Sequence, residues 1–247
     1  MAVLSGKGAV VTGGSRGIGR AIVRRLAADG ATVVFSYLEN KEAAAQVTAE
    51  VAAAGGTAHA VRADQGSVAA VAELFGEASR RLPGLDIVVC NAAAGMPKPI
   101  DEVTEDDFDR DMATDAKGPF FVIQHAGRML RDGGRIIAIS TMSTRLHNPV
   151  VALYTGAKGA VENFTKVAAV AYGARGITAN IISPGATRTQ SLYDANPDDD
   201  FSETIELTAL RRLGEPEDIA AVVAFLAGPD GAWITGQNIA ADGGILP

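Results

Sequence analysis

Short apolar runs alternate along the chain with longer segments of helical period. The runs predict β-strands at 9–12, 32–36, 58–62, 86–90, 135–140, 178–183 and 238–240. The segments between them predict helices at about 17–29, 40–54, 67–81, 104–130, 152–173 and 215–227. Apolar strands separated by helices are typical of a parallel sheet covered on both faces. The pattern therefore predicts an α/β fold, a Rossmann-type doubly wound parallel sheet of about seven strands with helices on both faces.

One segment interrupts this alternation. Residues 185–214 contain Thr187, Thr189, Gln190, Asn196 and the acidic run 198–200. A connection of about thirty residues is uncommon and indicates either a lid or binding loop or an ordinary solvated helical insertion, and the pattern alone leaves both open. No linker, repeat or low-complexity tract divides the chain. We therefore expect one domain, 1–247.

Composition and charge exclude several classes of protein. Hydrophobic residues make up 47% of the chain, and 22 Lys and Arg against 29 Asp and Glu give a net charge of −7. This negative surface disfavours binding to nucleic acid or anionic lipid. A single cysteine, Cys90, excludes an internal disulfide framework, and no apolar run approaches the roughly 20 residues of a membrane span. Met1–Gly8 lacks a signal segment. We expect a soluble cytoplasmic protein without nucleic-acid or membrane partners.

A glycine-rich turn follows the first predicted strand, with the sequence Thr12-Gly13-Gly14-Ser15-Arg16-Gly17-Ile18-Gly19. Glycines let the chain turn tightly and bring backbone N–H groups close to a ligand. The helix that follows offers unpaired N–H donors and the positive end of its dipole to a pyrophosphate. This strand–turn–helix context predicts a dinucleotide site, and the lack of Gly-Lys-Ser/Thr disfavours a nucleoside triphosphatase.

The end of the second predicted strand favours one form of the cofactor. NAD-preferring Rossmann proteins usually carry an acidic residue there, whereas this chain has Tyr37 and no acid before Glu39. Arg16 in the glycine turn is suited to a forked contact with a 2′-phosphate. The sequence therefore favours NADP(H) over NAD(H). If Arg16 is an ordinary surface charge, half of this argument is lost.

Tyr154 and Lys158 stand four residues apart on a predicted helix, so they share one face. The ordinary pKa of tyrosine, about 10, is too high for efficient proton transfer at neutral pH. A nearby ammonium group stabilises the phenolate and would lower that pKa. By itself a Tyr-x-x-x-Lys spacing usually marks two surface residues without a catalytic role. Together with the nucleotide turn it predicts a catalytic pair.

Over its whole length the chain resembles the short-chain dehydrogenase/reductase family, in its single-domain subclass. Thr12-Gly13-x-x-x-Gly17-x-Gly19 matches the cofactor turn of the family, and Tyr154-Thr155-Gly156-Ala157-Lys158 matches its catalytic motif. Pro184-Gly185 with Thr189, and segments 213–220, 234–237 and 242–244, match later landmarks. Within the family the chain is similar to 3-oxoacyl-carrier-protein reductases and polyketide or naphthol ketoreductases.

The resemblance implies an NADPH-dependent reductase that transfers a hydride to a small or carrier-tethered ketone. Tyr154 would donate the proton, and Lys158 would hold the cofactor ribose and depress the Tyr154 pKa. The segment at about 186–213 would be the substrate lid of the single domain. Long helices at 104–130 and 152–173 would form the contacts of a homotetramer or homodimer. The residues assigned to the cofactor are Gly13, Ser15, Arg16, Gly17, Ile18, Gly19, Tyr37, Asp64, Gln65, Asn91, Ala92, Lys158, Pro184, Gly185, Thr187 and Thr189.

Two catalytic positions depart from the family pattern. Thr141 stands where the family has its catalytic serine, with Ser140 and Ser143 as alternates; Ser140 would face the opposite side of the strand. A threonine hydroxyl can still contact the carbonyl oxygen. Asp115 replaces the family's asparagine, and an ionised carboxylate near Lys158 would favour the ammonium and oppose the Tyr154 phenolate. We expect Asp115 to shift the pH optimum and lower turnover, unless it only caps or pairs locally, for example with Lys117.

The remaining polar residues predict less. The family's Asn-Asn-Ala-Gly reads Cys90-Asn91-Ala92-Ala93, and Cys90 is expected to be a buried thiol without a catalytic role. The three histidines lack metal-ligand spacing, so no metal site is expected. We expect the substrate to contact Thr141, Tyr154 and His147, the last of which is otherwise a solvated loop residue. The competing hypotheses are a weakly active or non-catalytic NADP(H)-binding homologue and an enzyme acting on an imine or alcohol.

Overall fold

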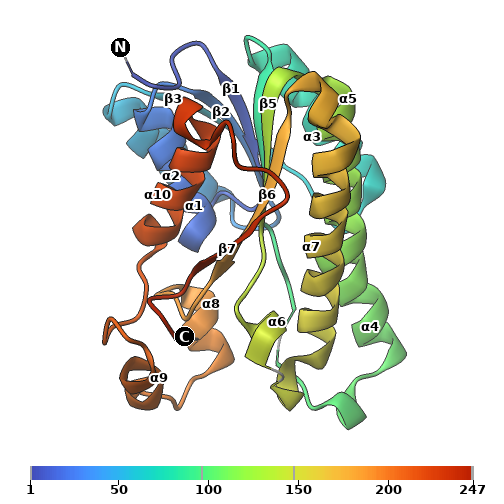
Figure 1. Cartoon of the computed structure of the whole chain (residues 1–247), viewed down its shortest axis with the longest axis vertical. Coiled ribbons are helices and arrows are strands. Elements are labelled where there is room, and N and C mark those ends of the chain that lie inside the picture. Colours follow the sequence, from blue (N-terminus) through green and yellow to red (C-terminus); the bar gives the residue numbers. More distant parts are fainter. Residues whose placement is uncertain (1, 96, 147, 246–247) are drawn as a thin grey trace.

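The computed structural model describes residues 2–95, 97–146 and 148–245. Within them seven parallel strands form one sheet of order β3-β2-β1-β4-β5-β6-β7 (Figure 1). The strands are β1 (Gly8–Val11), β2 (Thr32–Tyr37), β3 (Thr57–Arg62), β4 (Leu85–Cys90), β5 (Leu130–Ile139), β6 (Thr178–Pro184) and β7 (Asn238–Ala241). The predicted doubly wound parallel sheet is confirmed. Its order reverses between β1 and β4, where the carboxyl ends of the strands open a crevice.

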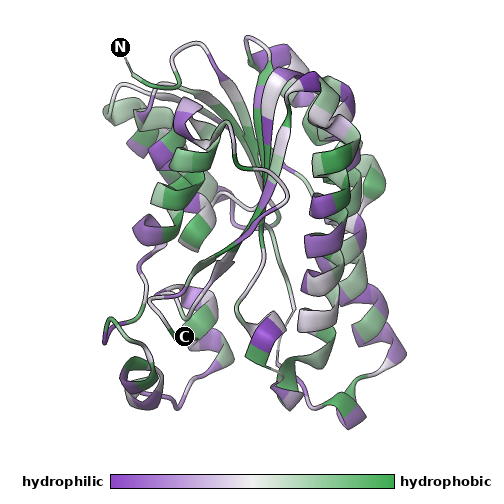
Figure 2. Cartoon of the chain, viewed as in Figure 1, coloured by the Kyte–Doolittle hydropathy of each residue, from purple (hydrophilic) through white to green (hydrophobic). Residues whose placement is uncertain are grey.

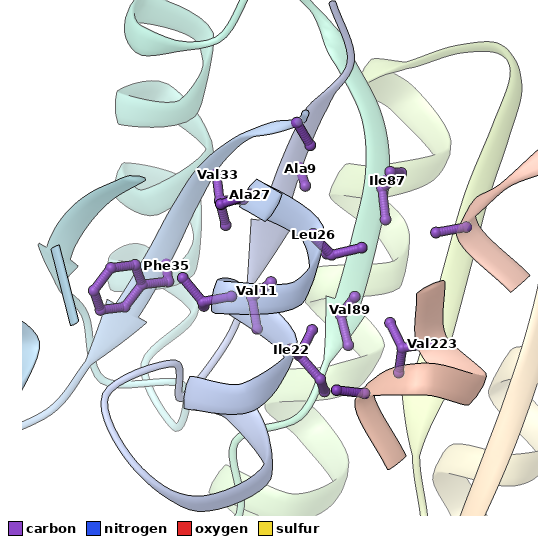
Figure 3. Close-up of a cluster of buried hydrophobic side chains, with 14 of the residues drawn as sticks. Ala9, Val11, Ile22, Leu26, Ala27, Val33, Phe35, Ile87, Val89 and Val223 are labelled. Atoms are coloured by element: carbon purple, nitrogen blue, oxygen red, sulfur yellow. The ribbon is translucent and has the colours of Figure 1, made fainter. Parts of the chain in front are cut away.

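Helices cover both faces of the sheet because successive strand side chains point to opposite faces. Val11 belongs to the core on one face and its neighbour Val10 to the core on the other. Figure 3 shows the first core, where Val11, Val33 and Val89 of the sheet meet Ile22 and Leu26 of the adjacent helix. Strands buried on both faces read as continuous apolar runs, which is why the sequence pattern located them.

The helices fall into two groups (Figure 1). The first consists of α1 (Gly17–Ala28), α2 (Lys41–Ala53) and α10 (Pro216–Ala227), and the second of α3 (Val68–Arg81), α5 (Gly118–Met129) and α7 (Ala152–Tyr172). Figure 2 shows hydrophobic and hydrophilic positions around each of these helices, the pattern of helices with one buried side. Shorter helical elements are α4 (Glu105–Met112), α6 (Ser143–Leu146), α8 (Gln190–Ala195), α9 (Ser202–Leu207), η1 (Ile100–Glu102), η3 (Pro149–Val151), η4 (Gly173–Arg175) and η5 (Pro229–Gly231).

The prediction of one continuous helix at 104–130 is wrong. A π-helical turn, η2 (Ala113–Lys117), separates α4 from α5, and the last residue of the predicted helix begins β5. A π turn fits one extra residue into a helix and so rotates the side chains within it. Periodicity alone does not reveal such a turn. Its consequence is that Asp115 is fully buried and directed at the loop after β4.

The two ends of the segment at 185–214, which follows β6, are joined by backbone hydrogen bonds. The backbone N–H of Arg188 donates to Gly214 O at 2.8 Å, and the N–H of Gly214 donates to Ala186 O at 2.9 Å. Between these closed ends lie α8 and α9, below the carboxyl edge of the sheet in Figure 1. The Tyr193 and Phe201 rings pack edge to face with centroids 5.6 Å apart. The segment is therefore a compact loop that contains two short helices.

The described residues contain neither a candidate membrane span nor a metal-binding cluster. No helix among them is long and apolar enough to cross a membrane. No group of three or more His, Cys, Asp or Glu in this part of the chain is arranged to hold a metal ion.

Candidate active site

The glycine turn lies between β1 and α1 at the crevice where the strand order reverses. Gly13 and Gly17 have positive φ angles of 67° and 51°, which residues with a side chain rarely adopt. A Cβ atom on Gly19 would overlap the carbonyl oxygen of Gly13 and lie 2.6 Å from Asn91 Nδ2. No side chain of the described residues caps the amino terminus of α1, where Arg16 is the N-cap residue. The close-packed glycine backbone and the uncapped helix dipole fit the pyrophosphate of a dinucleotide.

Side chains from the neighbouring strands fix this turn. Asn91, after β4, donates from Nδ2 to Thr12 O at 3.0 Å and to Gly13 O at 3.1 Å. The N–H groups of Asn91 and Ala92 donate to Thr12 Oγ1 at 3.0 and 3.1 Å. On the other side, the N–H of Gly13 donates to Ser36 Oγ at 3.0 Å. Asn91 and Ala92, which the sequence assigned to the cofactor, thus hold the turn that would bind it, and Ser36 is a support that the sequence missed.

The ends of β2 and β3 lie beside the turn. Tyr37 pairs with Arg62 across these strands, and no acidic side chain occupies the end of β2. Arg16 is exposed and makes no ion pair or hydrogen bond with a side chain of the described residues. Asp64, after β3, accepts from the N–H of Gly66 at 2.8 Å. This corner presents a free guanidinium group and no carboxylate at the end of β2.

The side chain of Gln65 connects two separate segments of the chain, a contact that the sequence did not predict. Its Nε2 atom donates to Ala92 O and Thr114 O, both at 2.9 Å, and the side chain is buried. It therefore ties the loop after β4 to the π turn. Its buried Oε1 atom has no hydrogen-bond partner among the described residues.

The chain after β6 completes the rim of the crevice. Gly185, which follows Pro184, approaches Asp242 so closely that a Cβ atom would lie 2.8 Å from Asp242 Cα. Thr187 donates to Gly185 O at 2.9 Å, and Thr189 Oγ1 accepts from the N–H of Leu192 at the start of α8. A Cβ atom on Gly17 would lie 3.2 Å from Thr189 Cγ2. The segment at 185–214 thus begins directly against the glycine turn.

Tyr154 and Lys158 lie one turn apart on α7 and face the same crevice. Lys158 is buried, with 3% of its surface exposed, and its Nζ donates to Ile139 O at 3.0 Å. The same Nζ lies 5.7 Å from the centre of the Tyr154 ring. The end of β5 therefore fixes the ammonium group beside the phenol.

Ser140 and Thr141 point in different directions at the end of β5. Ser140 Oγ donates to Glu162 Oε1 at 2.7 Å, away from Tyr154. Thr141 lies beside the Tyr154 hydroxyl and lowers its pKa, and its Oγ1 donates to Ser143 Oγ at 3.2 Å. Glu162, which also accepts from Thr144 Oγ1 at 3.1 Å, was missed by the sequence analysis. Its position four residues after Lys158 on the same helix face was the available signal.

The electrostatics of the crevice differ from expectation. Burial, then the charge of Asp115, raise the pKa of Tyr154, and the neighbouring Thr141 hydroxyl only partly offsets them. Burial lowers the pKa of Lys158, while Asp115 and Cys90 raise it. Burial raises the pKa of Asp115, against the opposing effect of Lys158. The pKa of Tyr154 is therefore raised overall, because removing the phenolate from water has the largest effect, and the lowering expected from Lys158 stays a prediction.

Asp115 accepts hydrogen bonds from two successive backbone N–H groups, those of Ala94 at 2.8 Å and Gly95 at 2.9 Å. The alternative of a local pair with Lys117 is wrong, because the carboxylate is buried and directed across to the loop after β4. Gly95 was not predicted as a site residue. A Cβ atom there would lie 2.8 Å from Tyr154 Cδ2, so this glycine packs directly against the ring.

A cavity of about 110 Å³ adjoins Tyr154 on the side of α4. Apolar side chains of Val103, Val150 and Leu153 form part of its wall. The charged residues along it form ion pairs: Lys98 with Asp107 at 2.5 Å and Arg110 with Asp111 at 3.0 Å.

Two further sequence predictions concern Cys90 and His147. Cys90 is buried, and burial raises the pKa of its thiol to about 12, which keeps it protonated and unreactive as expected. His147, predicted as a substrate contact, lies outside the described residues.

Residues 13–246 match a family model described as enoyl-(acyl carrier protein) reductase. A hydroxynaphthalene reductase-like protein of Metarhizium brunneum is 42% identical and aligns over 98% of this chain and 96% of its own length. Versicolorin reductase 1 of Aspergillus parasiticus is 38% identical, over 98% and 97% of the two chains.

Solved structures show the same fold. A blue fluorescent protein from a metagenomic library, in complex with NADPH, has a TM-score of 0.93 and 42% identity, over 99% of this chain and 100% of that one. The angucycline C-6 ketoreductase LanV, with bound NADP, has a TM-score of 0.92 and 40% identity, over 99% and 97%. Two further neighbours are a short-chain dehydrogenase/reductase of Serratia marcescens and a short-chain dehydrogenase of Burkholderia cenocepacia in complex with NADP. The chain belongs to the short-chain dehydrogenase/reductase family of NAD(P)H-dependent oxidoreductases, as its glycine turn and its Tyr-x-x-x-Lys motif predicted.

Proposed function

We propose that the chain is an NADPH-dependent carbonyl reductase that transfers a hydride to a ketone, with Tyr154 as the proton donor. The observation that carries this proposal is the meeting of Tyr154, Lys158 and Thr141 on the edge of the sheet that also bears the glycine turn. A nicotinamide cofactor bound here would supply the hydride for the new C–H bond. The carbonyl oxygen would take a proton to become a hydroxyl group.

The chain's own residues would handle this proton. Burial and Asp115 raise the pKa of Tyr154, so its hydroxyl holds the proton until the carbonyl oxygen becomes more basic. The Thr141 hydroxyl can donate to the same oxygen and orient it. Lys158, fixed by Ile139 O, carries the positive charge that stabilises the phenolate left on Tyr154.

The phosphorylated cofactor is supported by the corner beside β2. Arg16 is exposed next to the glycine turn, and Tyr37 stands where a carboxylate would repel a 2′-phosphate. The structural neighbours that carry NADPH or NADP agree with this choice. The proposed contacts are Arg16 to the 2′-phosphate and the N–H groups of the turn to the pyrophosphate.

Arg16→Ala is expected to weaken NADPH binding about tenfold and to leave NADH binding almost unchanged, because a charge-assisted contact to the 2′-phosphate is lost. Fluorescence titration with each cofactor measures both dissociation constants. Arg24→Ala on the same helix is the control, since Arg24 lies 3.8 Å from Glu50 and away from the turn. Equal losses for NADPH and NADH would contradict the assignment.

A free polycyclic aromatic ketone is the proposed substrate class. Hydroxynaphthalene, versicolorin and angucycline reductases appear among the relatives, and their names denote fused aromatic ring systems. A carrier-tethered substrate would need free cations for its phosphate group. Two of the three arginines near the loop are already paired with carboxylates, Arg188 with Glu215 at 2.9 Å and Arg212 with Asp218 at 2.6 Å. The third, Arg211, donates to the main-chain oxygen of Glu206. The free substrate is therefore favoured.

The test is to incubate the purified chain with NADPH and a panel of naphthol-type ketones, quinones, diketones and one carrier-linked ketone. NADPH consumption with a product heavier by two hydrogen atoms supports the proposal. NADPH binding without turnover would instead indicate a non-catalytic homologue. Turnover confined to imines or alcohols would assign the alternative reactions.

The loop at 186–213 is proposed as the substrate lid because its closed ends place α8 and α9 beside the crevice. A cytoplasmic location and assembly into a homotetramer or homodimer stay predictions from the sequence. Sedimentation of the purified chain would decide its assembly.

A further inference from the structure

Both oxygens of the Asp115 carboxylate accept hydrogen bonds from the loop after β4. Its Oδ1 accepts from the N–H of Ala94 at 2.8 Å and its Oδ2 accepts from the N–H of Gly95 at 2.9 Å. None of its surface is exposed. Each of the two donors thus has an acceptor oxygen of its own, which a carboxylate supplies and an amide in the same orientation does not. The π turn supplies the geometry, because it carries Asp115 out of the regular α-helical register.

The backbone that Asp115 holds lies directly against the Tyr154 ring. A Cβ atom on Gly95 would be 2.8 Å from Tyr154 Cδ2, 3.3 Å from Tyr154 Cβ and 2.9 Å from Asp115 Oδ2. Gly95 is therefore packed between the carboxylate and the ring, with no room for a side chain. Any shift of this backbone changes the surface on which the ring rests.

We propose that Asp115 is a positioning residue whose carboxylate clamps the Ala94–Gly95 backbone against Tyr154 and so fixes the direction of the phenol hydroxyl. This inference rests on the proposed function of Tyr154 as the proton donor. It reverses the expectation from the sequence, in which Asp115 lowers turnover through its charge. If the charge alone mattered, replacing Asp115 by the asparagine of the family pattern would raise activity. If the carboxylate clamps the backbone, the same replacement lowers activity.

The physical reason is the chemistry of the amide. An asparagine side chain has one acceptor oxygen and one NH₂ group, so one of the two backbone N–H groups would face another donor. A buried donor left without a partner is costly, and the loop would move to relieve the conflict. Small displacements of a catalytic group reduce rates strongly, by about a hundredfold for an ångström.

Charged groups around Asp115 provide a second readout. Lys158 and Tyr154 face it from α7, and Asp111 faces it from α4. The negative charge of Asp115 raises the pKa of Lys158 and that of Tyr154, so both groups keep their protons to higher pH. Without this charge both pKa values fall, and carbonyl reduction is lost at a lower pH on the alkaline side.

The experiment compares Asp115→Asn with the wild type in kinetics and amide hydrogen exchange. We expect kcat to fall about 10- to 100-fold with the KM for NADPH within about twofold, because the cofactor turn is untouched. The alkaline limb of the pH profile should move to lower pH. Exchange of the Ala94 and Gly95 amides should become faster.

Asp86→Asn is the matched control. Asp86 is buried at the opposite end of β4 and also accepts from a backbone N–H, that of Gly8 at 2.8 Å, but it lies far from the crevice. This variant should lose thermal stability while kcat and the pH profile stay unchanged. It therefore separates general loosening of the fold from loss of the clamp.

Gly95→Ala tests the other half of the contact if Asp115→Asn does not fold. Its methyl group must displace the Tyr154 ring, so kcat should fall with NADPH affinity kept. Normal or raised kcat in Asp115→Asn, normal kcat in Gly95→Ala, or unchanged exchange at Ala94 and Gly95 would each overturn the clamp. A wild type that reduces no carbonyl would overturn the proposed function instead, and the exchange measurement would still decide whether the carboxylate holds the loop.

Discussion

Tyr154→Phe is expected to lower kcat about 100- to 10,000-fold while leaving the affinity for NADPH within about twofold. The substitution removes one hydroxyl group and keeps the ring, so packing against Gly95 and the position of Lys158 are preserved. Only the proton donor is lost. Steady-state kinetics with the best ketone of the panel, together with NADPH titration, measures the two effects separately.

The control for this variant is Tyr172→Phe at the end of the same helix. Tyr172 is partly buried at the end of α7, where its ring packs next to Gly127 of α5. It lies more than four helical turns from Tyr154. Removing its hydroxyl should leave kcat unchanged. If Tyr154→Phe turns over at close to the normal rate, the proton comes from another group and the assignment of Tyr154 is wrong.

Gly19→Ala is expected to weaken NADPH binding about a hundredfold or more. The added methyl group would overlap Gly13 O and press on Asn91 Nδ2, so the turn that cradles the pyrophosphate must open. The hydrogen bonds from Asn91 that fix this turn would be lost with it. Calorimetric or fluorescence titration with NADPH measures the effect, and circular dichroism establishes that the variant is folded.

Gly76→Ala in α3 is the matched control. The nearest atom to its added Cβ would be the flexible end of Arg80 at 3.9 Å, so the methyl group fits. Replacing glycine by alanine inside a helix should stabilise the fold by about 0.5–1 kcal/mol without affecting NADPH. Normal NADPH affinity in Gly19→Ala would show that the cofactor does not bind at this turn.

The features that could be predicted from the sequence are those expressed by local patterns. Strands such as β4, Leu85–Cys90, are buried on both faces, so they appear as apolar runs whatever their neighbours are. The glycine turn is identifiable because Gly13 and Gly17 adopt backbone angles that other residues avoid. The Tyr154–Lys158 pair is identifiable because helix geometry alone places both residues on one face.

Other features depend on groups that lie far apart in the sequence. Gln65 ties Ala92 to Thr114, and no local pattern indicates such a brace. The raised pKa of Tyr154 results from burial, which depends on everything packed around the ring. The environment of a side chain is a property of the folded molecule, and its sequence neighbours supply only part of it.

The sequence by itself determined the doubly wound sheet, the family and the two motifs, because backbone geometry and burial impose periodic or short-range signatures. Only the tertiary structure decided what Asp115 does. The π turn that carries Asp115 and the Ala94–Gly95 loop lie far apart in the sequence, and only the fold brings them together. In the sequence Asp115 differs from the family pattern by its charge, whereas in the structure it forms two hydrogen bonds beside the Tyr154 ring.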